Sequence, residues 1–184
     1  MSQPAPSFAV VVAVMLTALL EVLDVSVVNV SLPHMIGAFG ATPDQITWTI
    51  TSYMISTAIV MPLTGYFSAR FGRRTVLLTA ISGFVVASGL CGAAWSLASM
   101  VVFRLLQGAF GAVLIPLSQT VLLDAFPKEK HGKAMAIWSI AIMVAPIVGP
   151  TIGGYITEHY VWRWVFYLNA PIGLIALLLA FGQI

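Results

Sequence analysis

Hydrophobic residues in this sequence occur in long runs rather than in alternation with polar residues. Short breaks rich in polar residues, glycine or proline separate the runs. A helix needs about 20 apolar residues to cross a hydrocarbon core of about 30 Å, and the runs reach that length. The alternation of period two that barrel strands require is missing from them. We therefore predict six transmembrane helices, at about residues 8–32, 48–67, 75–94, 99–123, 133–156 and 164–184.

Composition supports a membrane protein and excludes several other classes. Of 184 residues, 60% are hydrophobic and 8% are charged, whereas a soluble domain has about 25% charged residues. The single cysteine, Cys91, excludes an internal disulfide, and no histidines show metal-ligand spacing. Phosphate loops and nucleophile elbows are also missing. We expect an all-α integral membrane protein, one bundle over residues 1–184, embedded in a lipid bilayer, with no enzymatic activity, metal, cofactor or nucleic-acid partner.

The basic residues of the loops predict the orientation. With six spans both termini lie on one side, together with the loops after spans two and four. Cytoplasmic loops carry an excess of lysine and arginine, so we place both termini in the cytoplasm and the protein in the cytoplasmic (inner) membrane. The shared side holds six basic residues and the opposite loops hold one: Arg70, Arg73, Arg74, Lys128, Lys130 and Lys133 against Arg163.

Three ionisable residues fall inside the predicted spans: Glu21, Asp24 and Arg104. A charge near the bilayer centre costs at least about 2.5 to 3.5 kcal/mol, so such residues usually face a cavity or a partner. At about 1.5 Å per residue, Asp24 lies about 12 Å and Arg104 about 8 Å below the same membrane surface. The two side chains can therefore meet if their helices are neighbours. Gln107 shares a helix face with Arg104, as Glu21 does with Asp24.

Two interpretations of these charges are open. In one, Asp24 and Arg104 form a proton-responsive pair, because the protonation of a carboxylate depends on burial and on nearby charge. In the other, they form a fixed ion pair that only holds two helices in register. Glu21 is either part of the proton site or a second acid that lines a cavity. Spans one and four are the matching first members of two three-helix sets, as expected of inverted repeats in transporters.

Five segments along the chain resemble motifs of one family. They read LDVSVVNVSLP at 23–33, GYFSARFGRR at 65–74, RLLQG at 104–108, GPTIGG at 149–154 and WRWVFYLNAPIG at 162–173. In this order they resemble the major facilitator superfamily, specifically its EmrB/QacA type of drug:proton antiporters. The resemblance implies the N-terminal half of that fold and export of hydrophobic or amphipathic drugs, driven by a proton gradient. It assigns proton coupling and substrate contact to Asp24, Arg104, Glu21 and Gln107.

The resemblance also implies a conformational switch in the loop between spans two and three. Glycines there would allow close helix approach and a tight turn, and Asp124 would pair with one of the arginines. Ordinary positive-inside anchoring is the alternative. The family usually has an acid where this chain has Ala69. The switch residues are Gly65, Arg70, Gly72, Arg73, Arg74 and Asp124.

The motif in span five implies a hinge that seals against the other transporter half. Prolines remove backbone hydrogen bonds and permit bending, and small residues let helices pack closely. A plain packing seam is the alternative. The residues concerned, which we expect on or next to one face, are Pro146, Gly149, Pro150, Gly153 and Gly154.

The resemblance has consequences for partners. Family members have twelve or fourteen helices, so we expect this chain to be a fragment, or to require a C-terminal transporter half or a second copy. A Gram-negative member would work with a periplasmic adaptor and an outer-membrane channel. Two other functions fit the fold: a non-transporting binding or assembly module, and an importer of a small metabolite. The acids and arginine inside the spans disfavour the first, and the segment 149–154 disfavours the second.

Overall fold

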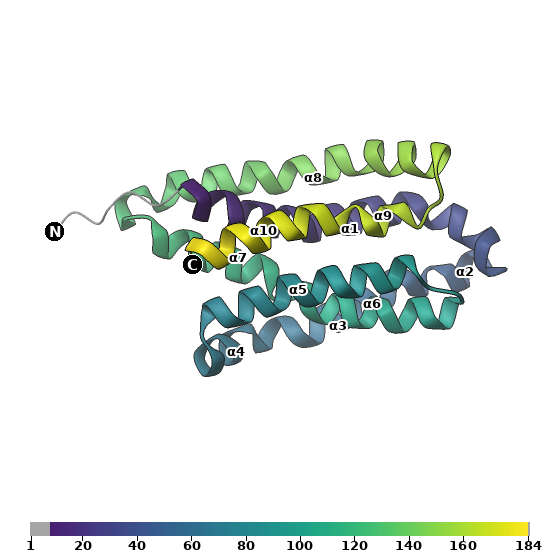
Figure 1. Ribbon diagram of the computed structural model, residues 1–184, viewed down its shortest axis with the longest axis horizontal. Coiled ribbons are helices and arrows are strands. Elements are labelled where there is room, and N and C mark those ends of the chain that lie inside the picture. Colours follow the sequence, from purple (N-terminus) through teal and green to yellow (C-terminus); the bar gives the residue numbers. More distant parts are fainter. Residues whose placement is uncertain (1–7, 184) are drawn as a thin grey trace.

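The computed structural model describes residues 8–183, and the regular elements among them are all helical. Six segments are long and apolar enough to cross a membrane, which confirms the predicted all-α, six-helix class (Figure 1). The last predicted residue of span six, Ile184, lies outside the described residues. The six segments are Phe8–Phe39, Pro43–Phe71, Arg73–Gly92, Leu97–Ala125, Lys128–His159 and Trp164–Gly182.

Several of the segments consist of more than one helical element. Span one is a single helix and so is span three, whereas spans two, four and six are interrupted. The elements are α1 (Phe8–Phe39), α2 (Pro43–Ile46), α3 (Trp48–Val60), η1 (Met61–Leu63), α4 (Thr64–Phe71), α5 (Arg73–Gly92), α6 (Leu97–Gly111), α7 (Leu114–Ala125), η2 (Lys128–Lys130), α8 (His131–His159), α9 (Trp164–Tyr167) and α10 (Asn169–Gln183).

Prolines account for most of the interruptions. A proline lacks the N–H that would bond to the carbonyl four residues earlier, and its ring clashes with that carbonyl. Pro116 affects Ala112, where α6 gives way to α7, and Pro171 affects Tyr167, the last residue of α9. Pro62 lies in η1, between α3 and α4. The breaks at Pro116 and Pro171 therefore occur about one turn before the proline, whereas Pro62 lies within its break.

The first helix is longer than the sequence predicts. We expected it to end near Leu32 because Pro33 follows, but α1 continues through Pro33 to Phe39. Because Pro33 has no N–H, the backbone carbonyl of Asn29 lacks its usual helical donor. The side chain of Asn29 donates to the Val25 carbonyl at 2.9 Å. The helix ends at Gly40, whose φ of 59° belongs to the left-handed region that glycine adopts readily.

The packing of the spans repeats between the two halves of the chain. Span one (α1) packs against span five (α8) and span six (α10), and span four (α6) packs against span two (α3) and span three (α5). If span one corresponds to span four, span two to span five and span three to span six, each of these contacts has its counterpart in the other set. In Figure 1, α1, α8, α9 and α10 occupy the upper part of the bundle and α3, α4, α5 and α6 the lower part. This is the arrangement that two three-helix repeats require.

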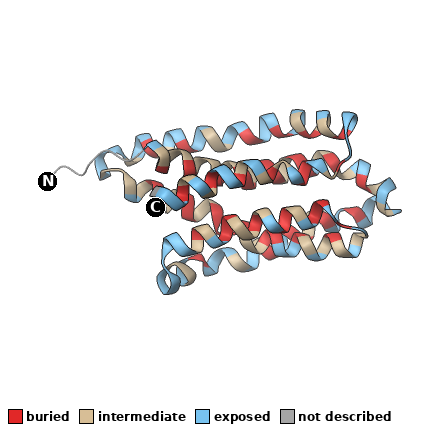
Figure 2. Ribbon diagram, viewed as in Figure 1, coloured by how far each residue is buried: buried red, intermediate tan, exposed pale blue. Residues whose placement is uncertain are grey.

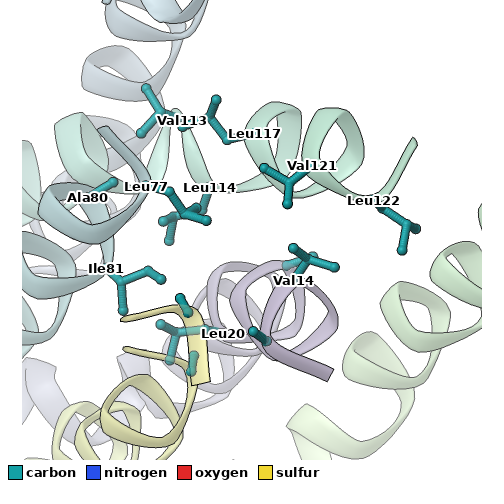
Figure 3. Close-up of a cluster of buried hydrophobic side chains, with 14 of the residues drawn as sticks. Val14, Leu20, Leu77, Ala80, Ile81, Val113, Leu114, Leu117, Val121 and Leu122 are labelled. Atoms are coloured by element: carbon teal, nitrogen blue, oxygen red, sulfur yellow. The ribbon is translucent and has the colours of Figure 1, made fainter. Parts of the chain in front are cut away.

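Two apolar clusters fill the bundle, with burial concentrated on the facing sides of the helices (Figure 2). The first gathers side chains of α1, α5 and α7, including Leu20, Ile81 and Leu114 (Figure 3). The second includes Met100 on α6 and Phe166 on α9. In lipid such contacts stabilise through close packing rather than through removal of water.

The two ends of the bundle differ in charge. The start of α1, the end of α10, the α4–α5 turn and the α7–α8 connection lie at one end, on the left of Figure 1. We call this the basic end, because it carries Arg70, Arg73, Arg74, Lys128 and Lys130. The other end carries short connections at residues 40–42, 93–96 and 160–163, and we call it the opposite end.

Candidate functional site

Asp24 and Arg104 form an ion pair in the interior of the bundle. Arg104 Nη1 donates to Asp24 Oδ2 at 2.6 Å. Arg104 is 0% exposed and Asp24 is 1% exposed. The structure therefore brings together the two groups that the depth argument placed at one level. Arg104 lies on α6 and bonds to Asp24 on α1. The ion pair therefore links one helix of the lower part of the bundle to one of the upper part, as these parts appear in Figure 1.

The second oxygen of Asp24 is also occupied. Asp24 Oδ1 accepts a hydrogen bond from Gln107 Nε2 at 2.9 Å and one from Asn169 Nδ2 at 2.5 Å. Gln107 Oε1 in turn accepts from Arg104 Nη1 at 2.7 Å. Hydrogen bonds to a charged group contribute about 1.5 to 3 kcal/mol each, roughly twice the neutral value. With Ser88, these residues form what we call the central polar cluster: Asp24, Ser88, Arg104, Gln107 and Asn169.

Two members of this cluster were missed by the sequence analysis. Asn169 bonds to Ser88 Oγ at 2.8 Å as well as to Asp24, and Ser88 Oγ donates to the Phe166 carbonyl at 2.8 Å. Both side chains are 1% exposed. Asn169 begins α10 directly after the break at Leu168, so its amide turns inward. The signal available in the sequence was an amide side chain inside an apolar span, since a polar group in lipid needs a partner.

Arg104 makes further contacts that hold its guanidinium in place. Its Nε donates to the Thr49 carbonyl at 3.1 Å, and its Cζ lies 4.2 Å from the centre of the Tyr53 ring. Such a cation–π contact contributes about 2 kcal/mol when it is shielded from water. Nη2 is buried without a hydrogen-bond partner among the described residues. Arg104 is therefore fixed by α1, α3 and α6 together.

Glu21 lies one turn before Asp24 but outside the central polar cluster. It is 7% exposed, and its Oε2 has no hydrogen-bond partner among the described residues. Glu21 lines a cavity of about 360 Å³ between α1 and α8. The sequence placed Glu21 and Asp24 on one face of α1, and the structure gives the two carboxyl groups different surroundings. The other lining residues are Val22, Val25, Ser26, Asn29 and Pro146.

At the basic end, one of the three candidate arginines pairs with Asp124. Arg73 Nη1 forms an ion pair with Asp124 Oδ2, both side chains being about half exposed. Arg74 instead donates from Nη2 to the Phe181 carbonyl at 2.7 Å, and Arg70 is exposed beside the ring of Phe71. The switch residues thus have different partners.

The two glycines of this loop also differ. Gly72 has φ 82°, so it forms the tight turn between α4 and α5 that was expected of it. Gly65 is exposed, and a Cβ at this position meets no atom within 4 Å. Gly65 therefore meets no neighbouring helix of this chain, and the close helix approach expected at this residue stays a prediction.

The candidate hinge in α8 divides into two sets. Gly149 and Gly153 are buried against α1, where a Cβ would collide with Ser26 and lie 3.1 Å from the Val27 carbonyl, respectively. Pro146 and Pro150 are exposed, and a Cβ at Gly154 meets nothing within 4 Å. α1 of the same chain therefore occupies the face of the two buried glycines, and sealing of the hinge set against another half stays a prediction.

The fold and the buried ion pair define a class, that of multi-pass helical membrane proteins built like secondary transporters. The proton:xylose symporter XylE bound to 6-bromo-6-deoxy-D-glucose superimposes with a TM-score of 0.83 at 20% identity, covering 95% of this chain and 44% of that one. The human organic anion transporter MFSD10 gives a TM-score of 0.75 at 21% identity, covering 98% of this chain and 48% of that one. At these identities the likeness concerns the fold alone.

Sequence comparison gives the family. The chain belongs to the Major Facilitator Superfamily, whose profile matches residues 14–183. Among similar proteins, the multidrug export protein EmrB of Haemophilus influenzae is 45% identical over 168 residues, which are 91% of this chain and 33% of that protein. The fatty acid resistance protein FarB of Neisseria gonorrhoeae is 44% identical over 161 residues, 88% of this chain and 32% of that protein. The chain spans about a third of the length of these relatives.

Proposed function

We propose that this chain is the N-terminal half of a proton-coupled exporter of hydrophobic or amphipathic compounds. The observation that carries the proposal is the buried pair of Asp24 and Arg104. Ionisable groups inside membrane spans are costly and mark substrate and proton pathways. The names of two relatives, a multidrug export protein and a fatty acid resistance protein, support an apolar substrate.

The central polar cluster supplies a two-state element for such a transporter. Its hydrogen bonds join α1, α6 and α10 across the two parts of the bundle. A change in charge at α1 alters the attraction across this junction, and a buried ion pair that loses one charge is strongly destabilised. Protonation inside the bundle can thus shift the balance between inward- and outward-facing states, which is the coupling that an antiporter requires.

The walls around Glu21 suit a broad range of substrates. The cavity combines one carboxyl group with apolar side chains such as Val22 and Val25. Apolar surfaces with few directional polar groups discriminate weakly between substrates of similar size. We therefore propose that recognition rests on hydrophobicity and charge rather than on a precise set of hydrogen bonds.

A complete substrate site requires a second half. Facilitator-type transporters bind substrate between two six-helix halves that rock against each other. The exposed face of α8, which includes Ile140, Met143 and Ile147, is a large apolar surface in this chain. We propose that a C-terminal half or a second copy completes the transporter.

The basic end supports a location in the cytoplasmic membrane with both chain ends on the cytoplasmic side. Accessibility of introduced cysteines tests this orientation. Lys130→Cys should react with a membrane-impermeant thiol reagent only in inside-out vesicles, and Ala93→Cys, at the opposite end, only in intact cells. In a cell with two membranes, we further propose a periplasmic adaptor and an outer-membrane channel as partners, and co-purification with the complete transporter tests that assembly.

Transport in reconstituted vesicles tests the function. The complete transporter that contains this chain is reconstituted into proteoliposomes loaded with a lipophilic fluorescent dye, and a pH gradient is imposed. We expect dye movement opposite to the proton gradient, which stops when nigericin dissipates that gradient. Movement in the same direction as protons would indicate an importer. No movement of any probe would favour a binding or assembly module.

A further inference from the structure

We propose that the groove between α5 and α10 binds an anionic phospholipid, with one acyl chain along the groove and the phosphate at Arg74. We call it the α5–α10 groove. The lipid belongs to the leaflet at the basic end of the bundle. Its site depends on the membrane-spanning fold, and on neither proton coupling nor the identity of a transported substrate.

The α5–α10 groove is apolar and has a volume of about 730 Å³. α6 and α10 both pack against α5, without a comparable contact to each other, so they flank it (Figure 1). The residues that α5 contributes to the groove are mainly small: Thr79, Ser82, Gly83 and Ala87. The flanking helices contribute large apolar side chains: Leu106, Phe110, Leu177, Leu178 and Phe181. The result is a shallow channel along α5 that has apolar walls.

The length of the groove matches an acyl chain. The α5 residues that line it run from Leu78 to Leu90, and a helix rises about 18 Å over these 12 residues at about 1.5 Å per residue. One leaflet of a hydrocarbon core of about 30 Å is about 15 Å thick. Arg74 precedes Leu78 by one turn, so it lies about 6 Å closer to the basic end. A lipid whose chain occupies the groove therefore has its phosphate near the level of Arg74.

Arg74 gives the entrance of the groove a positive charge. Its Nη2 donates to the Phe181 carbonyl at 2.7 Å, and its Cζ lies 5.5 Å from the centre of the Phe181 ring. Arg74 is exposed and forms no ion pair with a carboxylate of the described residues, whereas Arg73 pairs with Asp124. A guanidinium group has five N–H donors in a fork that matches phosphate geometry. Arg74 can therefore bind a phosphate while it stays on Phe181.

The helices around the groove offer Arg74 no acid in place of a phosphate. Within their described residues, α4, α5, α6 and α10 contain neither aspartate nor glutamate. Basic pockets between transmembrane helices bind anionic lipid headgroups. Contacts between an acyl chain and apolar side chains add little affinity of their own, because the surrounding lipid is equally apolar. The headgroup charge therefore determines which lipid binds, and the groove determines where it lies.

The groove faces away from the side on which a second half would pack. α1 packs against α8 and α10, and α6 packs against α3 and α5. α5 and α10 also contact each other, whereas α3 and α8 make no comparable contact. The exposed apolar face of α8 therefore belongs to one side of the bundle, and the α5–α10 groove belongs to the other. Bilayer lipid is the neighbour that this other side meets.

Lipid binding to the purified complete transporter tests the inference. Native mass spectrometry measures the Kd of the first bound dioleoyl phosphatidylglycerol and of the first bound dioleoyl phosphatidylcholine, which share both chains and differ in headgroup charge. We expect phosphatidylglycerol to bind at least about fivefold more tightly. Glycerol 3-phosphate, which carries the anion without the chains, should not displace phosphatidylglycerol at millimolar concentration.

Variants assign the bound lipid to the groove. Arg74→Gln should reduce the preference for phosphatidylglycerol to less than about twofold, and Arg74→Lys should retain most of it, because the charge remains. Lys128→Gln, which removes an exposed positive charge from the same end, should leave the preference unchanged. Thr79→Trp fills the groove at an exposed residue and should weaken binding of both lipids. Ile175→Trp, at an exposed residue of α10 outside the groove, should not.

Several outcomes would overturn the inference. Equal Kd values for the two lipids in the wild type would mean that any apolar neighbour, lipid or helix, covers the groove. Equal losses in Arg74→Gln and Lys128→Gln would mean that net charge alone attracts the lipid. Displacement by glycerol 3-phosphate, or wild-type binding in Thr79→Trp, would show that the groove is not needed. The test of Thr79→Trp stands even if Arg74→Gln fails to fold, because it leaves Arg74 in place.

Discussion

Arg104 shows how a single charged residue is accommodated inside an apolar bundle. It has an ion pair with Asp24, an amide contact to Gln107, a backbone acceptor at Thr49 and the face of Tyr53. The desolvation cost of such a pair is comparable to its Coulombic gain, so the pair itself adds little net stability. Loss of one partner is different, because it leaves an uncompensated charge. The cluster is therefore sensitive to substitution at every member.

Asn169 provides a prediction at this scale. Asn169→Ala removes the donor at 2.5 Å from Asp24 and leaves Ser88 without its amide partner. Loss of a hydrogen bond to a charged group costs about 1.5 to 3 kcal/mol, so we expect the initial rate of pH-driven dye export to fall about tenfold or more. Asn169→Asp should be more severe, because it places a second carboxylate against Asp24. Wild-type rates in Asn169→Ala would show that the amide is not needed to position Asp24.

Residue types and depth along the helices were sufficient to predict that Asp24 and Arg104 can meet if their helices are neighbours. The sequence offers an amide in an apolar span but could not place Asn169 beside Asp24, because its position depends on where α9 ends and on how α10 turns afterwards. Nor could the sequence show that the two acids of α1 have different surroundings. Glu21 and Asp24 share a face in the sequence pattern, and only the positions of Arg104 and of the cavity beside Pro146 distinguish them.

At the scale of elements, the contact between α1 and α8 depends on two small residues. Gly149→Ala places a methyl group against Ser26, and overpacking of this kind costs about 1 to 3 kcal/mol. We expect a lower Tm of the purified transporter, measured by intrinsic fluorescence. The double variant Gly149→Ala with Ser26→Gly should recover most of the loss.

Gly154→Ala is the matched control, since a Cβ there meets no atom within 4 Å. Its Tm should equal that of the wild type. Equal destabilisation by Gly149→Ala and Gly154→Ala would contradict the packing described for α8. Sequence pattern alone could not separate the two positions, because both belong to one glycine-rich motif and only the rotation of α8 against α1 decides which is buried.

The ion pair of Arg73 and Asp124 offers a separate test of conformational switching. Both side chains are about half exposed, and exposed pairs contribute about 0.2 to 1 kcal/mol. Asp124→Asn should therefore change the Tm little but reduce the export rate several-fold, if the pair stabilises one transport state. Arg70→Gln, which removes an exposed arginine of the same loop, should have little effect on the rate. Equal effects of the two substitutions would support simple electrostatic anchoring instead.

Proline explains why helix number was easier to predict than helix continuity. Pro116 and Pro171 interrupt spans four and six, but α1 passes through Pro33 and α8 passes through Pro146 and Pro150. A proline inside a long apolar run can bend a helix or divide it, and neighbouring helices determine which occurs. Hydrophobic length alone was sufficient to predict the six spans.

At the scale of the whole molecule, transport requires a second half. The 184-residue chain alone, purified and reconstituted, should bind the lipophilic dye weakly and should produce no pH-driven flux, because one six-helix unit provides one side of a rocking interface. Co-expression with the remaining part of the transporter should restore flux. Robust flux from this chain as a monomer would contradict the assignment of the substrate site to an interface between halves.

The most direct test of the central claim is pH-driven dye export by the complete transporter carrying Asp24→Asn. The account predicts loss of at least about 90% of the export rate, because Arg104 is left without its compensating charge in the interior. Asp44→Asn, an exposed acid at the opposite end, should export at the wild-type rate. Unimpaired proton-driven export by Asp24→Asn would contradict the claim that the buried ion pair couples protons to transport.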